Sequence, residues 1–171
     1  MCLTPNRFYY FFAVFFLLLI NSSFATQLDN KAKMIILSDS TIYDNKSGIT
    51  IFEGHVKVTQ GTTLILADRL TTKTNATHKI TEIIAYGTSK VAEYSQIADN
   101  GQLFKASANI IKYYPTDANI TLEQNVTVSQ GKNSFHASVI HYNRLSETLI
   151  VPESSTGRAV LIYNPDSKSG L

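Results

Sequence analysis

The chain has 171 residues, of which 44% are hydrophobic and 16% are charged, so it is long enough for one domain with a sizeable core. Fifteen Lys and Arg residues nearly balance thirteen Asp and Glu residues, and a net charge of +2 argues against a nucleic-acid partner, which needs a concentrated basic surface. The single cysteine, Cys2, precedes the first apolar run, so the rest of the chain offers neither a disulfide nor a thiolate metal site.

The first 25 residues have the pattern of a secretory signal peptide. Arg7 is the only charged residue before an apolar run over 8–20, and the small residues Ser23 and Ala25 stand where a cleavage site requires them. The alternative is an uncleaved membrane anchor, but 13 residues are fewer than the roughly 20 that span a bilayer. We therefore expect export of the chain and cleavage after Ala25.

The rest of the chain has the pattern of short strands. Runs rich in Ile, Val, Thr, Tyr and Phe alternate with Gly, Asn, Asp and Ser, which is typical of strands joined by tight turns. The sequence predicts a single all-β domain over 26–163 with about sixteen short antiparallel strands, followed by a polar flexible tail over 164–171. In chain order the strands are expected near 33–37, 40–45, 48–53, 55–60, 63–66, 68–73, 80–86, 88–95, 102–106, 108–114, 118–123, 125–130, 133–137, 139–143, 147–151 and 157–163.

The two halves of this strand series are predicted to be copies of one 70-residue unit. The segments 53–61 and 123–131 align without a gap at a shift of 70 residues, and both read E-x-x-V-x-V-x-Q-G. The same shift pairs Tyr43 with Tyr113, Ala67 with Ala137, and Gly87 with Gly157. A gapless register over this span indicates an internal repeat, and the alternative is two unrelated hairpins of similar composition.

The repeat indicates which side chains face inward. Either alternate pair in the segment 49–52 could be buried, but one of the two phases would bury Asn119 and Thr121 in the second copy. Burial of polar groups without partners is costly, so the opposite phase is expected to face an apolar interior. The predicted lining of that interior is Phe52, Val56, Val58, Ile65, Leu70, Ile120, Leu122, Val126, Val128, Phe135 and Ile140. Strands with one apolar face can close it as a two-sheet sandwich or as a coiled sheet around an apolar interior.

The sequence contains no strong catalytic or metal-binding pattern. The four histidines are not spaced as a ligand set, and no G-x-S-x-G elbow occurs. Glu53 and Glu123 are equivalent in the two copies and could form the carboxylate pair of a glycan hydrolase, although both are expected at solvated strand ends next to turns. We expect no enzymatic activity, no cofactor and no metal.

The two ends of the strand series are predicted to be open edges. The first strand, near 33–37, is unusually apolar for an exposed edge, and the last strand lies near 158–163. Unprotected edges invite the addition of another strand. We therefore expect association with another molecule through Ile35 and Leu37 at one end, and through Val160 and Ile162 at the other.

Five short segments carry a resemblance to a known family. They are 34–39 (MIILSD), 52–61 (FEGHVKVTQG), 67–68 (AD), 86–87 (YG) and 99–101 (DNG). These segments resemble the LptA/OstA-like family of periplasmic lipopolysaccharide-transport proteins of Gram-negative bacteria. The resemblance covers about 33–163 and implies a single β-jellyroll of V-shaped strands, open at both ends. It also implies ligand contacts at Met34 and Ile36 near the N-terminal edge, and at the aromatic Tyr94.

The function that the resemblance implies is lipid carriage in the periplasm. Such proteins bridge the inner and outer membranes and shelter the acyl chains of the lipid A moiety of lipopolysaccharide. They join head to tail, with an inner-membrane-anchored partner at the N-terminal edge and an outer-membrane translocon at the C-terminal edge. The alternative function is a structural or adhesive β-module that pairs with proteins through its edges and binds no lipid.

Overall fold

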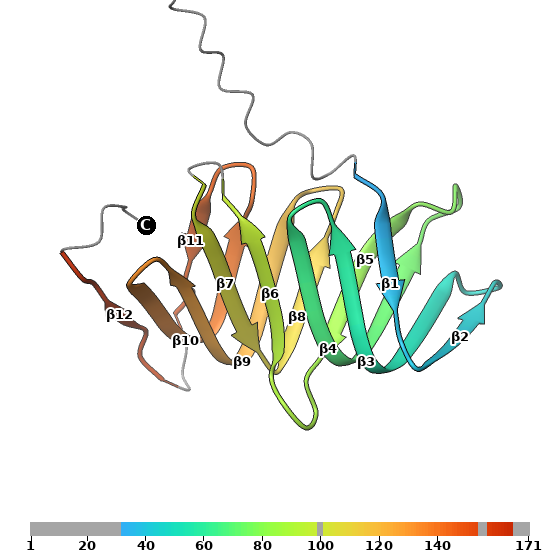
Figure 1. The fold of residues 1–171 in the computed structure, drawn as a ribbon, viewed down its shortest axis with the longest axis horizontal. Coiled ribbons are helices and arrows are strands. Elements are labelled where there is room, and N and C mark those ends of the chain that lie inside the picture. The colour runs from blue at the N-terminus through green and yellow to red at the C-terminus, as the bar shows by residue number, and fades with distance from the viewer. Residues whose placement is uncertain (1–31, 99–100, 154–156, 166–171) are drawn as a thin grey trace, which may run out of the picture.

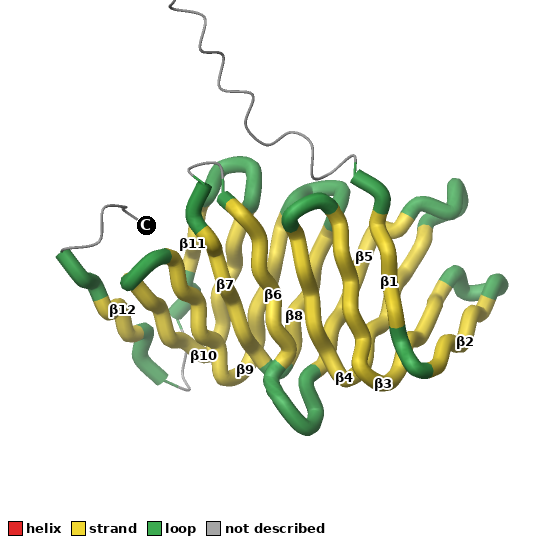
Figure 2. Tube along the Cα trace, viewed as in Figure 1, coloured by secondary structure: helices red, strands yellow, loops and turns green. Residues whose placement is uncertain are grey.

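The computed structural model describes residues 32–98, 101–153 and 157–165, which form an all-β fold (Figure 1). Within these ranges the chain consists of strands and loops (Figure 2), and no described segment is a helix long and apolar enough to cross a membrane. The twelve strands of the described ranges are β1 (Met34–Leu37), β2 (Ser40–Asp44), β3 (Ile49–Gln60), β4 (Thr63–Thr74), β5 (Ile80–Tyr86), β6 (Ala92–Ile97), β7 (Leu103–Ala108), β8 (Ile110–Tyr114), β9 (Asn119–Gln130), β10 (Asn133–Asn143), β11 (Thr148–Ile150) and β12 (Val160–Ile162). The expected signal peptide over 1–25 and most of the expected tail lie outside the described residues.

The all-β class predicted from the sequence is confirmed, but the strand count differs from the expected sixteen. β3, β4, β9 and β10 have 11 or 12 residues each, and each of them joins two of the short strands that the sequence suggested. The physical reason is that these strands bend without ending. Their pairing register shifts between Glu53 and Val56 and between Ala137 and Val139, as at a β-bulge.

The bent strands belong to two layers at once. The first layer has the order β1, β3, β4, β6, β7, β9, β10, β12. The second layer has the order β2, β3, β4, β5, β8, β9, β10, β11. Each long strand is therefore a V whose bend lies along one side of the molecule. We call the opposite side, where the turns at the ends of the two arms lie, the mouth.

The backbone geometry recurs at a spacing of 70 residues. β3 spans 49–60 and β9 spans 119–130, so both ends of the two strands are 70 residues apart. The bulge residues Gly54 and His55 have φ of 77° and 45°, and their counterparts Gln124 and Asn125 have φ of 64° and 54°. Glycine adopts such angles at little cost, and Asn and His tolerate them better than most other residues, so Gln124 is the one bulge residue whose type does not favour its conformation.

A continuous apolar core fills the space between the two layers. All the large buried apolar side chains of the described residues belong to one cluster, to which both layers contribute. Alternation along each strand explains this, because residues two apart point to the same side of a sheet. On β3, for example, Val56 and Val58 are buried while Lys57 is exposed.

Candidate functional site

The interior between the layers gathers the residues that were predicted to line it. Ten of them are buried in the core cluster, namely Val56, Val58, Ile65, Leu70, Tyr94, Ile120, Leu122, Val126, Val128 and Ile140. The other four, Met34, Ile36, Phe52 and Phe135, are partly buried and pack against the same cluster. The structure therefore brings all fourteen residues to one apolar region, which includes the three residues inferred from the resemblance.

Four aromatic rings connect the two layers near the mouth. Phe104 on β7 stacks on Tyr142 on β10, with 4.5 Å between the ring centroids. Tyr94 on β6 contacts Phe104 edge-on at 6.2 Å and Tyr113 on β8 at 6.5 Å. β6 and β7 belong to the first layer, whereas β8 and this part of β10 belong to the second. These rings are at most 5% exposed, so they pack closely against one another and fill the interior at this level.

Polar side chains cover the apolar interior on its mouth side. Gln60, Thr63, Gln96 and Asn133 are buried and lie at or near the turn ends of their strands in the first layer. The Tyr94 hydroxyl donates a hydrogen bond to Gln96, and Asn133 Oδ1 accepts one of 2.9 Å from the backbone N–H of Asn164. Burial raises the pKa of the Tyr94 phenol, so this group stays protonated.

The second layer contributes a cation to this polar cover. Arg144 directly follows β10, and its guanidinium Nη1 donates a hydrogen bond of 2.7 Å to the hydroxyl of Tyr113. The same guanidinium lies 5.7 Å from the centroid of the Tyr113 ring. The site predicted from the sequence did not include Phe104, Tyr113, Tyr142 or Arg144. Alternation could have indicated Tyr142, which lies two residues after the predicted inward residue Ile140, but it did not indicate the other three.

The two ends of the layered stack are open edges in the described part of the chain. β1 and β2 lie at one end and β11 and β12 at the other (Figure 1), and each of these four strands pairs on one side only. The predicted edge residues are about half exposed, with 47% for Ile35, 58% for Leu37, 50% for Val160 and 52% for Ile162. The sequence predicted one edge strand at each end, whereas the structure has two because both layers end there.

The candidate catalytic carboxylates do not converge on the interior. Glu53 and Glu123 face outward, and each pairs with a cation on a neighbouring strand. Glu53 lies 3.4 Å from Arg69, and Glu123 lies 2.6 Å from Lys112, whose pKa it raises through this hydrogen bond. Within the described residues no group of three or more His, Cys, Asp or Glu side chains could hold a metal ion. The outer face therefore offers no support for the hydrolase alternative.

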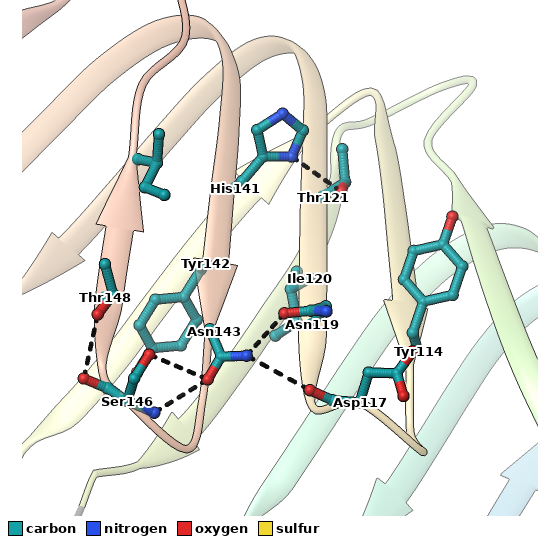
Figure 3. A pocket seen from close by; sticks show the side chains of 11 residues that line it. Tyr114, Asp117, Asn119, Ile120, Thr121, His141, Tyr142, Asn143, Ser146 and Thr148 are labelled. Atoms are coloured by element: carbon teal, nitrogen blue, oxygen red, sulfur yellow. Dashed lines mark hydrogen bonds between the residues drawn. The ribbon is translucent and has the colours of Figure 1, made fainter.

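A hollow of about 560 Å³ lies on the outer face of the second layer, away from the apolar interior (Figure 3). Its polar side chains bond to one another. Asn143 donates to Asn119 at 2.7 Å and accepts from the backbone N–H groups of Leu145 and Ser146, and Thr121 lies 3.1 Å from His141. Asn143 therefore holds the turn between β10 and β11. Of the predicted lining residues only Ile120 borders this hollow, so it is distinct from the predicted site.

Comparison with known proteins assigns the family. The sequence profile described as "LptA/(LptD N-terminal domain) LPS transport protein" matches residues 35–148, which is about two thirds of the chain. The chain belongs to this LPS transport protein family. The match begins inside β1 and ends at the start of β11, so it spans nearly all of both layers.

Individual members of the LptA family agree with this assignment. The lipopolysaccharide export system protein LptH of Pseudomonas aeruginosa is 30% identical over 127 residues, which are 72% of this chain and 71% of that protein. The lipopolysaccharide export system protein LptA of Haemophilus influenzae is 26% identical over 147 residues, 85% of this chain and 84% of that protein. The crystal structure of P. aeruginosa LptH has the same fold, with a TM-score of 0.73, 24% identity, and coverage of 81% of this chain and 99% of that one.

Proposed function

We propose that this chain is a non-enzymatic carrier that shelters the acyl chains of lipopolysaccharide between its two layers. The observation that carries the proposal is the single apolar interior between the two layers of a chain that belongs to an LPS transport family. P. aeruginosa LptH is described as a periplasmic component of the lipopolysaccharide transport device, and this supports a periplasmic location for the present chain.

The interior gives a physical reason for acyl-chain binding. Each CH₂ group that leaves water gains roughly 0.8 kcal/mol, so an apolar space between sheets can hold chains without specific polar contacts. The space is occupied by the protein's own side chains, and the Phe104–Tyr142 and Tyr94–Tyr113 contacts join the layers across the mouth. Binding therefore requires the layers to part at the mouth, and the bent strands are the natural hinge.

We further propose that copies join head to tail through their open edges. The unpaired side of β1 would accept β12 of the next copy, and the unpaired side of β2 would accept β11, so that both layers and the apolar interior between them continue from copy to copy. In the same arrangement an inner-membrane-anchored partner would pair with the N-terminal edge, and an outer-membrane translocon with the C-terminal edge. The exposed apolar side chains at both edges support this, because such surfaces usually mark interaction sites.

Site-specific photo-crosslinking to lipopolysaccharide tests the carrier function. A photoreactive phenylalanine analogue at Phe52 on β3 or at Leu122 on β9 would face the interior, and the same analogue at Lys57, which is also on β3, would face solvent. We expect the interior positions to capture lipopolysaccharide and Lys57 to capture none. Capture at Lys57 alone would contradict the proposal.

The closed interior favours one competing function, a protein-binding β-module with a dry core. Tyr94, Tyr113 and Leu122 are at most 1% exposed, as in a core that holds no ligand. Native mass spectrometry of the protein purified from its own host distinguishes the two. A carrier would retain a lipid-sized mass increment in part of the population, whereas a dry module would show the mass of the polypeptide alone.

A further inference from the structure

Arg144 is placed at the mouth by contacts that fix both its backbone and its side chain. Its N–H donates a hydrogen bond of 2.9 Å to the carbonyl oxygen of Ala118, which ties the turn after β10 to the turn between β8 and β9. Its guanidinium donates to the Tyr113 hydroxyl at 2.7 Å, and the Tyr113 ring is 1% exposed. The cation is therefore held at the boundary between the apolar interior and the surface.

The positive charge of Arg144 acts across the mouth. Tyr94 lies on the first layer, and the Arg144 guanidinium on the second layer opposes part of the rise that burial causes in the pKa of Tyr94. The buried groups beside Tyr94 on the mouth side, Gln96 and Thr63, are neutral. The acidic residues of the adjoining turns, Asp117 and Glu147, are exposed to solvent.

We infer that Arg144 binds the anionic headgroup of the amphiphile whose chains enter the interior, and that Tyr113 positions its guanidinium. This inference rests on the proposed carrier function. An amphiphile with its chains between the layers must keep its head at the mouth, because a charged head buried without a partner would be costly. A guanidinium presents a planar fork of donors that matches phosphate or carboxylate, and a charge-assisted hydrogen bond is about twice as strong as a neutral one.

The test compares amphiphiles that share a twelve-carbon chain and differ in the head. Dodecyl phosphate, laurate and dodecyl maltoside are titrated into the full chain by calorimetry below their critical micelle concentrations. We expect the wild type to bind the anionic heads about tenfold more tightly than the neutral sugar head. Tighter binding of dodecyl phosphate than of laurate would identify phosphate as the preferred head, and the reverse order would identify carboxylate.

Arg144→Gln should abolish the preference for anionic heads and leave the dissociation constant for dodecyl maltoside unchanged. Arg144→Lys should keep part of the preference, and Tyr113→Phe, which retains the cation, should weaken it without abolishing it. Arg69→Gln is the matched control, because Arg69 lies 5.8 Å from the Tyr86 ring in the same kind of contact, but on the outer face. Circular dichroism confirms that each variant is folded, and Arg144→Lys replaces Arg144→Gln if the latter is not.

The outcomes separate this inference from the proposed function. Binding of none of the three amphiphiles would overturn the carrier function and the inference together. Equal binding of all three by the wild type, or an equal loss in Arg69→Gln and Arg144→Gln, would overturn the role of Arg144 and leave acyl-chain binding intact.

Discussion

At the scale of single residues, two glycines at equivalent positions of the repeat have very different surroundings. A Cβ added at Gly87 would lie 2.1 Å from the carbonyl oxygen of Lys90 and 2.4 Å from the backbone nitrogen of Ala92. A Cβ added at Gly157 would meet nothing closer than Ser138 Oγ at 3.8 Å. Because the obstacles at Gly87 are backbone atoms of the loop that leads into β6, they cannot move without displacing that strand.

We expect Gly87→Ala to lower the free energy of unfolding by about 2 kcal/mol or more, as overpacking against backbone does. Gly157→Ala should change it by less than about 0.5 kcal/mol. Urea unfolding followed by circular dichroism measures both variants. Equal midpoints for the two would show that the loop before β6 can shift freely.

Asp68 also holds the loop between β5 and β6, through hydrogen bonds. Its Oδ2 accepts hydrogen bonds of 2.7 and 2.6 Å from the backbone N–H groups of Thr88 and Ser89, and both hydroxyls donate to it as well. These donors favour the ionised carboxylate and hold its pKa well below the usual range. Asp68 lies next to the bend of β4. Its carboxylate therefore fixes the loop by which the chain passes from β5 in the second layer to β6 in the first layer.

At the scale of strands, the inward faces could be predicted from sequence, because they depend on alternation, which is a local pattern, and on an internal repeat, which the sequence shows when it is aligned with itself. The bulge at 53–55 was predictable for the same reason, since Gly54 interrupts two alternating runs. The contacts between the rings that close the mouth could not be predicted in this way. Phe104 and Tyr142 stack although 38 positions separate them in the sequence, because β7 in the first layer and the C-terminal arm of β10 in the second layer face each other across the interior. Arg144 follows the last residue of its strand, where no alternation indicates a direction.

The connection between β1 and β2 is fixed to the bulge of β3 by an ion pair that depends on pH. The backbone N–H of Asp39 donates to the carbonyl oxygens of Glu53 and Gly54, and its carboxylate lies 2.7 Å from His55 Nδ1. The hydrogen bond and the charge of Asp39 raise the pKa of His55. A histidine pKa that is raised by folding stabilises the protein fully below the unfolded value near 6.5, and this contribution is lost as the pH rises through the folded value.

We therefore expect Asp39→Asn to reduce stability more at about pH 5.5 than at about pH 9, where His55 is neutral in both proteins. The effect should be small and should shrink in 1 M salt, because both side chains are exposed. Thermal unfolding at the two pH values measures it, and an NMR titration of His55 should show a lower pKa in the variant. An unchanged His55 pKa would mean that the pair does not form in solution.

At the scale of the whole molecule, the two ends of the stack differ, and this decides what kind of assembly is possible. The N-terminal end presents β1 and β2, and the C-terminal end presents β11 and β12. Contacts between two different surfaces are heterologous, so they form open chains unless the rotation closes a ring. Head-to-tail growth and two-fold dimerisation therefore make opposite predictions when one end is blocked.

Proline on an edge strand can block one end selectively. Successive N–H groups along a strand point to opposite sides. Of the two variants Ile35→Pro and Ile36→Pro, one therefore removes an N–H donor from the free side of β1 and the other from its paired side. The variants Val160→Pro and Leu161→Pro differ in the same way on β12. The useful variant of each pair is the one whose monomer keeps the melting temperature of the wild type, because its internal pairing is intact.

Mixing the two blocked variants tests the direction of assembly. Each variant alone should remain monomeric, because every head-to-tail contact needs one free N-terminal end and one free C-terminal end. A mixture should form 1:1 dimers and nothing longer, whereas the wild type should grow with concentration. Analytical ultracentrifugation distinguishes these states. If the C-terminally blocked variant dimerises by itself, the N-terminal ends pair with each other and the head-to-tail arrangement is wrong. Dimers that appear only in the mixture would show that each contact joins the N-terminal end of one copy to the C-terminal end of the next.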